Sequence, residues 1–322
     1  MRRWLQNAAL ALAGAWWALA ASAQTLPTGT GCPPLPQAPT AEQVEAAQKS
    51  ARDRGLLWKI TRDGASSYLY GTVHVGKLEW ALPGPKLGAA LGASSTIALE
   101  IDPTDPTLAG RMTVPAATAP TLSTELQQRL SRRLDAACLT PALREYMERQ
   151  HPMLRAVTLG LLEARWEGLD VSYGQEILLA GFGRSTQRRI VSLETPESQL
   201  ALMLPATAGE LEGAIASLLD QLDDGAVRRS VARLGAAWER GDVAMFEDYE
   251  RWCECVRNDD DRALMRRLLH DRNGPMAERI DALHRDGKGG LFAAVGTLHM
   301  VGPQGLPALL RARGFTVERI AP

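Results

Sequence analysis

Residues 67–76 read Ser-Tyr-Leu-Tyr-Gly-Thr-Val-His-Val-Gly, a short apolar run that leads directly into a Gly-x-x-His motif. The same context, Gly-Thr-Leu-His at 296–299, follows a second apolar run far along the chain, and the chain has only five His. Strand ends are where α/β proteins place ligand-binding groups, and a glycine there lets another backbone or a ligand approach closely. We therefore expect His74 and His299 to follow neighbouring strands and to face one cleft.

A carboxylate fits the same site. Glu100 lies at the end of a third apolar run, 96–101, between Leu99 and Ile101. Two neutral imidazoles and one carboxylate are a donor set that suits a catalytic divalent metal with an open position for water. The chain has no His-Glu-x-x-His motif, so residue types alone also allow structural histidines or catalysis without a metal.

Six short apolar runs predict the strands, and the segments between them carry helical patterns. We expect an α/β (α+β) fold, with a mixed β-sheet covered by helices and the two Gly-x-x-His motifs at strand ends. Residues 41–322 are interpreted as a single domain, in which helical insertions at about 122–182 and 196–285 form a cap. The predicted strands are Leu56–Thr61, Ser67–Val73, Thr96–Ile101, Arg189–Glu194, Gly290–Val295 and Phe315–Ile320.

Helix starts are marked by capping residues and by proline in the first turn. A capping box at Thr40 and Gln43 predicts a helix that ends near Gly55, and a second box is expected at Ser172 and Gln175. Further signals are Thr140-Pro141, Thr195-Pro196 and the acidic run Asp259–Asp261.

The N-terminus predicts export. Met1–Ala23 has the arginines, apolar stretch and small residues of a signal peptide, and 24–40 is a proline-rich linker. We expect a periplasmic or secreted protein without a permanent membrane anchor. The 322 residues are 45% hydrophobic, and 36 Lys and Arg against 37 Asp and Glu give a net charge of −1, which indicates no nucleic-acid partner.

Four cysteines are compatible with disulfides in an exported chain. Four cysteines allow three pairings, and the sequence does not decide which partners Cys32 and Cys138 have. Cys253 and Cys255 are separated by one residue, and we expect a bridge between them to be strained, so that each reaches a distant partner or stays free.

Five motifs, in order along the chain, resemble the TraB/GumN family, which is related to the TIKI metalloproteases of animals. They are Trp58-Lys59-Ile60 with residues 67–76, Leu99-Glu100-Ile101, Gly168-Leu169-Asp170 with 191–199, Arg272-Asn273 with Met276 and Ile280, and 296–299. The resemblance implies a paired Gly-x-x-His fold with both His and the Glu at one site. It also implies kinship with metal-dependent peptidases that use manganese or cobalt, and more distantly with erythromycin esterases and a haem-binding protein. The chain is most similar to the soluble, exported GumN-like branch.

These observations predict a metal-dependent hydrolase, in particular a peptidase, that acts on a peptide or protein substrate. His74, Glu100 and His299 would hold manganese, cobalt or zinc, and Glu100 would serve as ligand or general base. Arg272 and Asn273 are candidates for stabilising an oxyanion, with a structural pair at a helix end as the alternative. The alternative function is a non-enzymatic metal- or haem-binding protein of the cell envelope.

The remaining polar candidates have ordinary interpretations. Asp170 is expected to cap a helix, Glu194 to bond to the following helix start, and Glu79 is a rival metal ligand. The other three histidines, His151, His270 and His284, are expected on the solvated surface.

Overall fold

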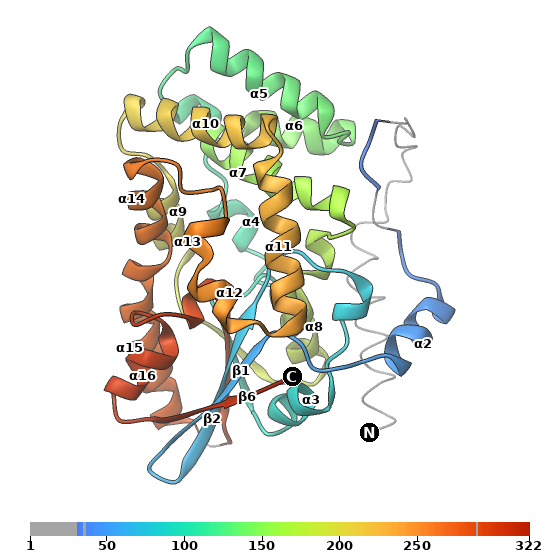
Figure 1. Ribbon diagram of the computed structural model, residues 1–322, viewed down its shortest axis with the longest axis vertical. Helices are drawn as coiled ribbons and strands as arrows, with labels where there is room; N and C mark the ends of the chain where they lie inside the picture. Colours follow the sequence, from blue (N-terminus) through green and yellow to red (C-terminus); the bar gives the residue numbers. More distant parts are fainter. Residues whose placement is uncertain (1–30, 35–36, 288) are drawn as a thin grey trace.

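The computed structural model describes residues 31–34, 37–287 and 289–322 (Figure 1). The predicted signal peptide Met1–Ala23 and parts of the predicted linker at 24–40 lie outside the described residues. The strands are β1 (Leu56–Arg62), β2 (Ala65–Thr72), β3 (Thr96–Leu99), β4 (Arg189–Ser192), β5 (Leu291–Gly296) and β6 (Thr316–Ile320).

Helices precede, separate and follow the strands. The α-helices are α2 (Ala41–Lys49), α3 (Pro85–Gly92), α4 (Leu108–Arg111), α5 (Thr124–Ala136), α6 (Pro141–Arg149), α7 (Pro152–Leu162), α8 (Gln175–Ser185), α9 (Pro196–Met203), α10 (Ala208–Asp223), α11 (Ala226–Arg240), α12 (Val243–Glu247), α13 (Tyr249–Trp252), α14 (Asp259–Leu268), α15 (His270–Asp286) and α16 (Leu306–Ala312). Short 3-10 helices are η1 (Leu78–Trp80), η2 (Ala116–Thr118), η3 (Glu163–Glu167), η4 (Val171–Tyr173) and η5 (Thr297–Met300).

The six strands form one mixed sheet in the order β4-β3-β5-β2-β1-β6. Strands β4, β3, β5 and β2 are parallel, whereas β1 runs antiparallel to both β2 and β6. The β1–β2 hairpin closes through a two-residue turn, Asp63 and Gly64, and both residues have positive φ. Positive φ at both positions gives the turn a twist that matches the twist of the two strands. The predicted α/β fold with a mixed sheet is therefore confirmed, although the third strand ends at Leu99 and leaves Glu100 in the loop.

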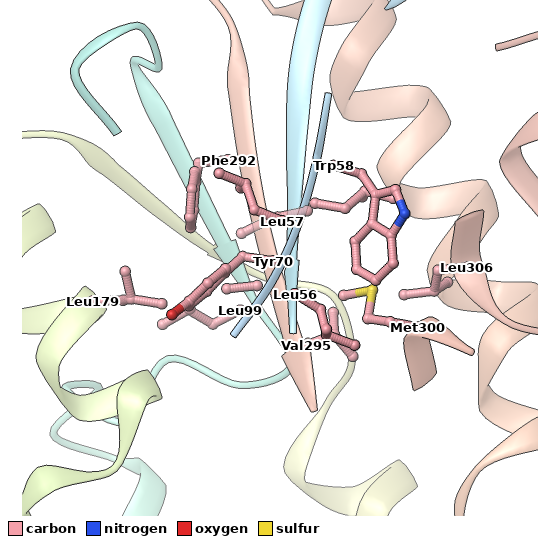
Figure 2. Close-up of a cluster of buried hydrophobic side chains, with 14 of the residues drawn as sticks. Leu56, Leu57, Trp58, Tyr70, Leu99, Leu179, Phe292, Val295, Met300 and Leu306 are labelled. Atoms are coloured by element: carbon pink, nitrogen blue, oxygen red, sulfur yellow. The ribbon is translucent and has the colours of Figure 1, made fainter. Parts of the chain in front are cut away.

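Apolar side chains cover both faces of the sheet. Every residue from Leu291 to Val295 is buried, as expected for a central strand in the parallel part of a sheet. Figure 2 shows Trp58 with Met300 and Leu306 on one side, and Tyr70 with Phe292 on the other. Neighbouring strand residues point to opposite faces, so the short strands contribute to two packed layers.

A second apolar core lies within the helices. Leu130 of α5, Leu159 of α7 and Ile215 of α10 are buried in a cluster separate from the one around the sheet. These helices occupy the upper end of the molecule in Figure 1, beyond the carboxyl edge of the parallel strands. The helical segment 124–162 lies between β3 and β4 in the chain, and 208–223 lies between β4 and β5.

Most predicted helix starts are confirmed, and two details are wrong. Thr40 forms its capping box with Gln43, but α2 ends at Lys49 and not near Gly55. Ser172 does not cap α8, which starts after Gly174. Its hydroxyl instead donates to Asp170, whose carboxylate caps η4, as expected for that residue.

Both cysteine pairs form disulfides. Cys32 is bonded to Cys138, which fixes the residues before α2 to the end of α5. Cys253 is bonded to Cys255, so the expectation of distant partners or free thiols is wrong. The reason is local: Glu254 has a φ of 54°, and this left-handed conformation brings the two Cα atoms to 5.0 Å. The disulfides are compatible with the predicted export.

Two histidines expected on the surface are buried. His151 accepts a hydrogen bond from the backbone N–H of Met153 at the start of α7, and burial lowers its pKa. His284 lies 2.8 Å from the Ser67 hydroxyl, against β2. Each satisfies a buried polar partner that sequence spacing does not reveal; only His270 is exposed as expected.

Across the described part of the chain, no single helix has the length and apolar composition of a membrane span, and only α9 with α10, bent by 85°, pass that test as a pair.

The Trp238 side chain is the clearest stability probe. It is fully buried, packs 5.0 Å from the Trp80 ring and donates from Nε1 to the Gly71 carbonyl at 2.8 Å. Trp238→Phe should lower the free energy of unfolding by about 2–4 kcal/mol, because it leaves both a gap and an unpaired buried carbonyl. Trp166→Phe, at a site 37% exposed, should change it by less than about 0.5 kcal/mol. Urea denaturation measures both, and equal effects would contradict this description.

Candidate functional site

The carboxyl ends of the four parallel strands bring the polar residues together. Glu100 directly follows β3, Glu194 comes two residues after β4, His74 two residues after β2, and His299 lies in η5 after β5. Because these strands are parallel neighbours, their ends share one edge of the sheet. Three of the predicted site residues thus reach this edge through strand topology.

The two Gly-Thr-x-His motifs are packed against each other. Gly71 pairs with Val295 and Thr72 with Gly296, and the Thr297 hydroxyl donates to the Thr72 carbonyl at 2.9 Å. A Cβ on Gly71 would lie 2.9 Å from the Thr297 hydroxyl and 3.2 Å from its backbone Cα. Glycine is therefore required for this close approach.

Glu100 is anchored by the second motif. Its Oε1 accepts the Gly296 N–H at 2.7 Å, and its Oε2 accepts from Arg272 and, at 3.3 Å, from Gln199. Burial alone would raise the pKa of Glu100, but the charge of His299, when protonated, and that of Arg272 hold it at about 2. Glu100 is an anion at neutral pH.

Arg272 is the cation at the centre of the site. Its guanidinium donates to Glu100 and, at 2.9 Å from Nε, to Glu194, and Nη1 also donates to the Leu268 carbonyl at 3.0 Å. Burial opposes its charge, but the hydrogen bonds to Glu194 and the charge of Glu100 raise the pKa of Arg272 above its usual range. One largely buried cation thus neutralises part of the charge of two carboxylates, the buried Glu100 and the largely buried Glu194.

His299 is held as a neutral imidazole. Its Nδ1 lies 2.7 Å from Asn273 Oδ1, which can only accept, so Nδ1 carries the proton. Its Nε2 faces Arg272 Nη1 at 3.3 Å. Burial lowers the pKa of His299 to about 4. Asn273 is fixed in turn by donating to the Gln304 carbonyl at 2.8 Å, so both ends of its amide are occupied.

His74 has the opposite environment. Its Nδ1 lies 3.2 Å from Glu176 Oε1, and Thr72 donates to the same oxygen at 2.5 Å. The Glu176 carboxylate raises the pKa of His74 to about 9. The imidazole is 61% exposed and forms part of a cavity wall, so its other nitrogen is accessible. His74 is therefore the cationic partner of the neutral His299.

These groups line one cavity of about 400 Å³. Four predicted site residues, His74, Glu100, Arg272 and His299, reach its surface, while Asn273 lies behind His299. The rest of the lining is largely apolar side chains from the helices. Glu79, the rival ligand, is exposed and does not line the cavity.

Sequence reasoning missed Glu176 and Gln199 and misassigned Glu194. Glu194 pairs with Arg272 and accepts from Gln199, and its side chain does not bond to the start of α9, which Thr195 caps. The only sequence signal for Glu176 was its place two residues after Gly174, at the start of α8. In the structure, this helix start lies beside His74 of the first Gly-x-x-His motif. No spacing rule connects α8 to residues 71–74.

The three predicted metal ligands do not form a cage. Within residues 31–34, 37–287 and 289–322, no three His, Cys, Asp or Glu side chains gather in an arrangement that would hold a metal ion. The Arg272 guanidinium instead bonds to Glu100 and faces His299 Nε2, two of the positions that a metal would need. In this arrangement the donor set does not fit a bound cation, because it already holds one.

A model described as the TraB/PrgY/gumN family matches residues 56–319. No curated protein and no solved structure matches the chain.

The Glu176 carboxylate controls the charge of His74, which an NMR titration can measure. In the native protein His74 should titrate near 9, and in Glu176→Gln its pKa should fall towards 6.5. Because the folded pKa is raised, this pair stabilises the fold fully below pH 6.5, and the contribution is lost as pH rises through about 9. The exposed Glu79→Gln variant should leave the titration unchanged. A native His74 that titrates near 6.5 would contradict the pairing.

Proposed function

We propose a function from the premise that the chain belongs to the TraB/PrgY/gumN family: it is a hydrolase that cleaves a carboxylic ester or amide bond between His74 and His299. The peptide or protein substrate predicted from the sequence belongs to this class. One observation carries the proposal. Two imidazoles line one cavity, and the residues behind them favour the charged form of His74 and the neutral form of His299.

His74 is suited to the role of general acid. The Glu176 carboxylate raises the pKa of His74 to about 9, so the ring is cationic at neutral pH. Both ring nitrogens then carry protons, and the exposed imidazole, which lines the cavity, can donate from Nε2. It would polarise the carbonyl oxygen and give its proton to the leaving oxygen or nitrogen. Glu176 is a positioning residue that keeps the ring oriented and charged.

His299 is suited to the role of general base. Its Nδ1 proton is held by Asn273, so Nε2 carries the lone pair. That lone pair accepts a hydrogen bond from Arg272 Nη1 at 3.3 Å, which it would exchange for a proton of water. The hydroxide so formed attacks the carbonyl carbon, and the carbon–oxygen or carbon–nitrogen bond breaks as His74 protonates the leaving group. Glu100, which favours the charged form of His299, stabilises the imidazolium. When the environments of two titratable groups move their pKa values apart, one group is typically the acid and the other the base.

Arg272 contributes its charge and not a free donor. Its N–H groups are engaged by Glu100, Glu194, the Leu268 carbonyl and His299 Nε2. It raises the positive potential where charge develops on the carbonyl oxygen, and it keeps His299 neutral. Asn273, the other residue considered for an oxyanion, acts through the orientation of His299.

A manganese, cobalt or zinc cofactor stays a prediction of the sequence. Its binding by His74, Glu100 and His299 would require Arg272 to leave Glu100, and we route no step of the reaction through it. The alternative prediction, a non-enzymatic metal- or haem-binding protein, uses the same side chains. Both are outcomes of the experiment below.

Ester substrates with different leaving groups test the assignment. His74→Ala should lower kcat/KM for an ethyl ester by about 10²–10⁴-fold, and by much less for a p-nitrophenyl ester, whose leaving group needs no proton. His299→Ala should lower both, because both need the base. His270→Ala, which changes an exposed histidine away from the cavity, should have no effect.

A chelator distinguishes the metal-dependent arrangement. Native activity should persist in excess chelator. Loss of activity that manganese, cobalt or zinc restores would overturn the metal-free mechanism and support the predicted cofactor. No hydrolysis of esters or peptides, with or without these metals, would overturn the hydrolase proposal. Metal analysis and a haem Soret band would then test the binding alternative.

A further inference from the structure

We propose that the substrate is an uncharged ester or amide of a lipophilic carboxylic acid, with its carbonyl at the polar floor and its apolar chain along the helical wall. This inference rests on the proposed function and names the substrate class of the same site. The observation behind it is the division of the cavity into a charged floor and an apolar wall.

The charged groups are confined to one end of the cavity. His74, Glu100, Arg272 and His299 follow the strands or come from α15, and no other ionisable side chain among the described residues lines the cavity. Each of these charges has a partner in the protein. A charged group on the distal part of a substrate would therefore find no counter-ion in the wall and would lose hydration.

The wall consists largely of aliphatic side chains from four helices, with Phe246 of α12 and Gln199 of α9 beside them. Leu161 comes from α7, Leu202 from α9, Leu234 from α11 and Leu268 from α14. These helices lie beyond the carboxyl edge of the sheet (Figure 1). The cavity has a volume of about 400 Å³, which is in the range of binding sites for small molecules. It suits a single chain better than a folded protein segment.

The helical origin of the wall disfavours an extended peptide. Backbone N–H and C=O groups in the middle of a helix are already paired within it, so they cannot bond to a peptide backbone. A peptide bound by β-addition needs a free strand edge, and the two edge strands of the described sheet, β4 and β6, do not line the cavity. Each peptide unit in the cavity would lose its hydrogen bonds to water, whereas a methylene chain has none to lose.

Two methionines make the wall adaptable. Met203 on α9 and Met265 on α14 line the cavity. Methionine is unbranched and fills irregular space, so such a wall accommodates chains of different shape. We expect chain length to affect binding more than chain branching.

Methyl ketones with alkyl chains of increasing length test the substrate class, because they carry the carbonyl but no bond that water can cleave. Calorimetry with the native protein should show affinity rising about threefold to fourfold for each added methylene, then levelling off when the cavity is full. Affinity that does not depend on chain length would overturn the inference.

Two leucines provide a matched pair of variants. Leu161 lines the cavity and is 37% exposed, whereas Leu143 on α6 is 39% exposed and lies outside it. Leu161→Asp should weaken ketone binding at least tenfold, and Leu143→Asp should leave it unchanged. Equal affinities in the two variants would count against an apolar chain along this wall.

Ketone binding is independent of hydrolysis, so the two proposals can fail separately. Chain-dependent binding without cleavage of any ester would overturn the hydrolase and retain the ligand class. Cleavage of a short ester without chain-dependent binding, or cleavage confined to unmodified peptides, would overturn the lipophilic substrate and retain the hydrolase.

Discussion

The close contact between Gly71 and Thr297 is the constraint on which the site depends. It joins the ends of β2 and β5, because the Thr297 hydroxyl donates to the Thr72 carbonyl where a side chain on Gly71 would intrude. The Trp238 indole closes the other side by donating to the Gly71 carbonyl. With both motifs fixed in this way, the two histidines emerge from adjacent strands at set positions, and the distance between them is a property of the sheet.

Charge balance is the second constraint. Two carboxylates, the buried Glu100 and the largely buried Glu194, share the single guanidinium of Arg272, which leaves one negative charge to be offset by its surroundings. Removing one partner from such a group is costly, because the others remain buried without compensation. The network also explains why His299 stays neutral so close to Glu100: burial and Arg272 both oppose its protonation. The same residues thus hold the structure together and set the charge of His299.

The sequence predicted the parts of this structure that depend on local pattern. The six strands follow from short apolar runs, and the site edge follows from a motif that occurs twice after such runs. Glu176 and Glu194 could not be assigned, because their partners, His74 and Arg272, are brought to them only by the packing of α8 and α15 onto the sheet. His284 reads as a surface residue of a polar helix, yet it bonds to Ser67 of β2. The Cys253–Cys255 bridge depends on the backbone conformation of Glu254, which composition does not encode.

The two apolar cores support different parts of the site. The core around the sheet fixes the polar floor, and its strands allow little variation, since a shift of one residue would turn each histidine away from the cavity. The walls come from α7, α9, α11 and α14, and α7 also contributes to the separate helical core. Side chains on these helices that face the cavity are only partly buried, so replacing one apolar residue by another costs the fold little. Such a division lets the shape of the wall change while His74, His299 and the ion pairs behind them stay in place.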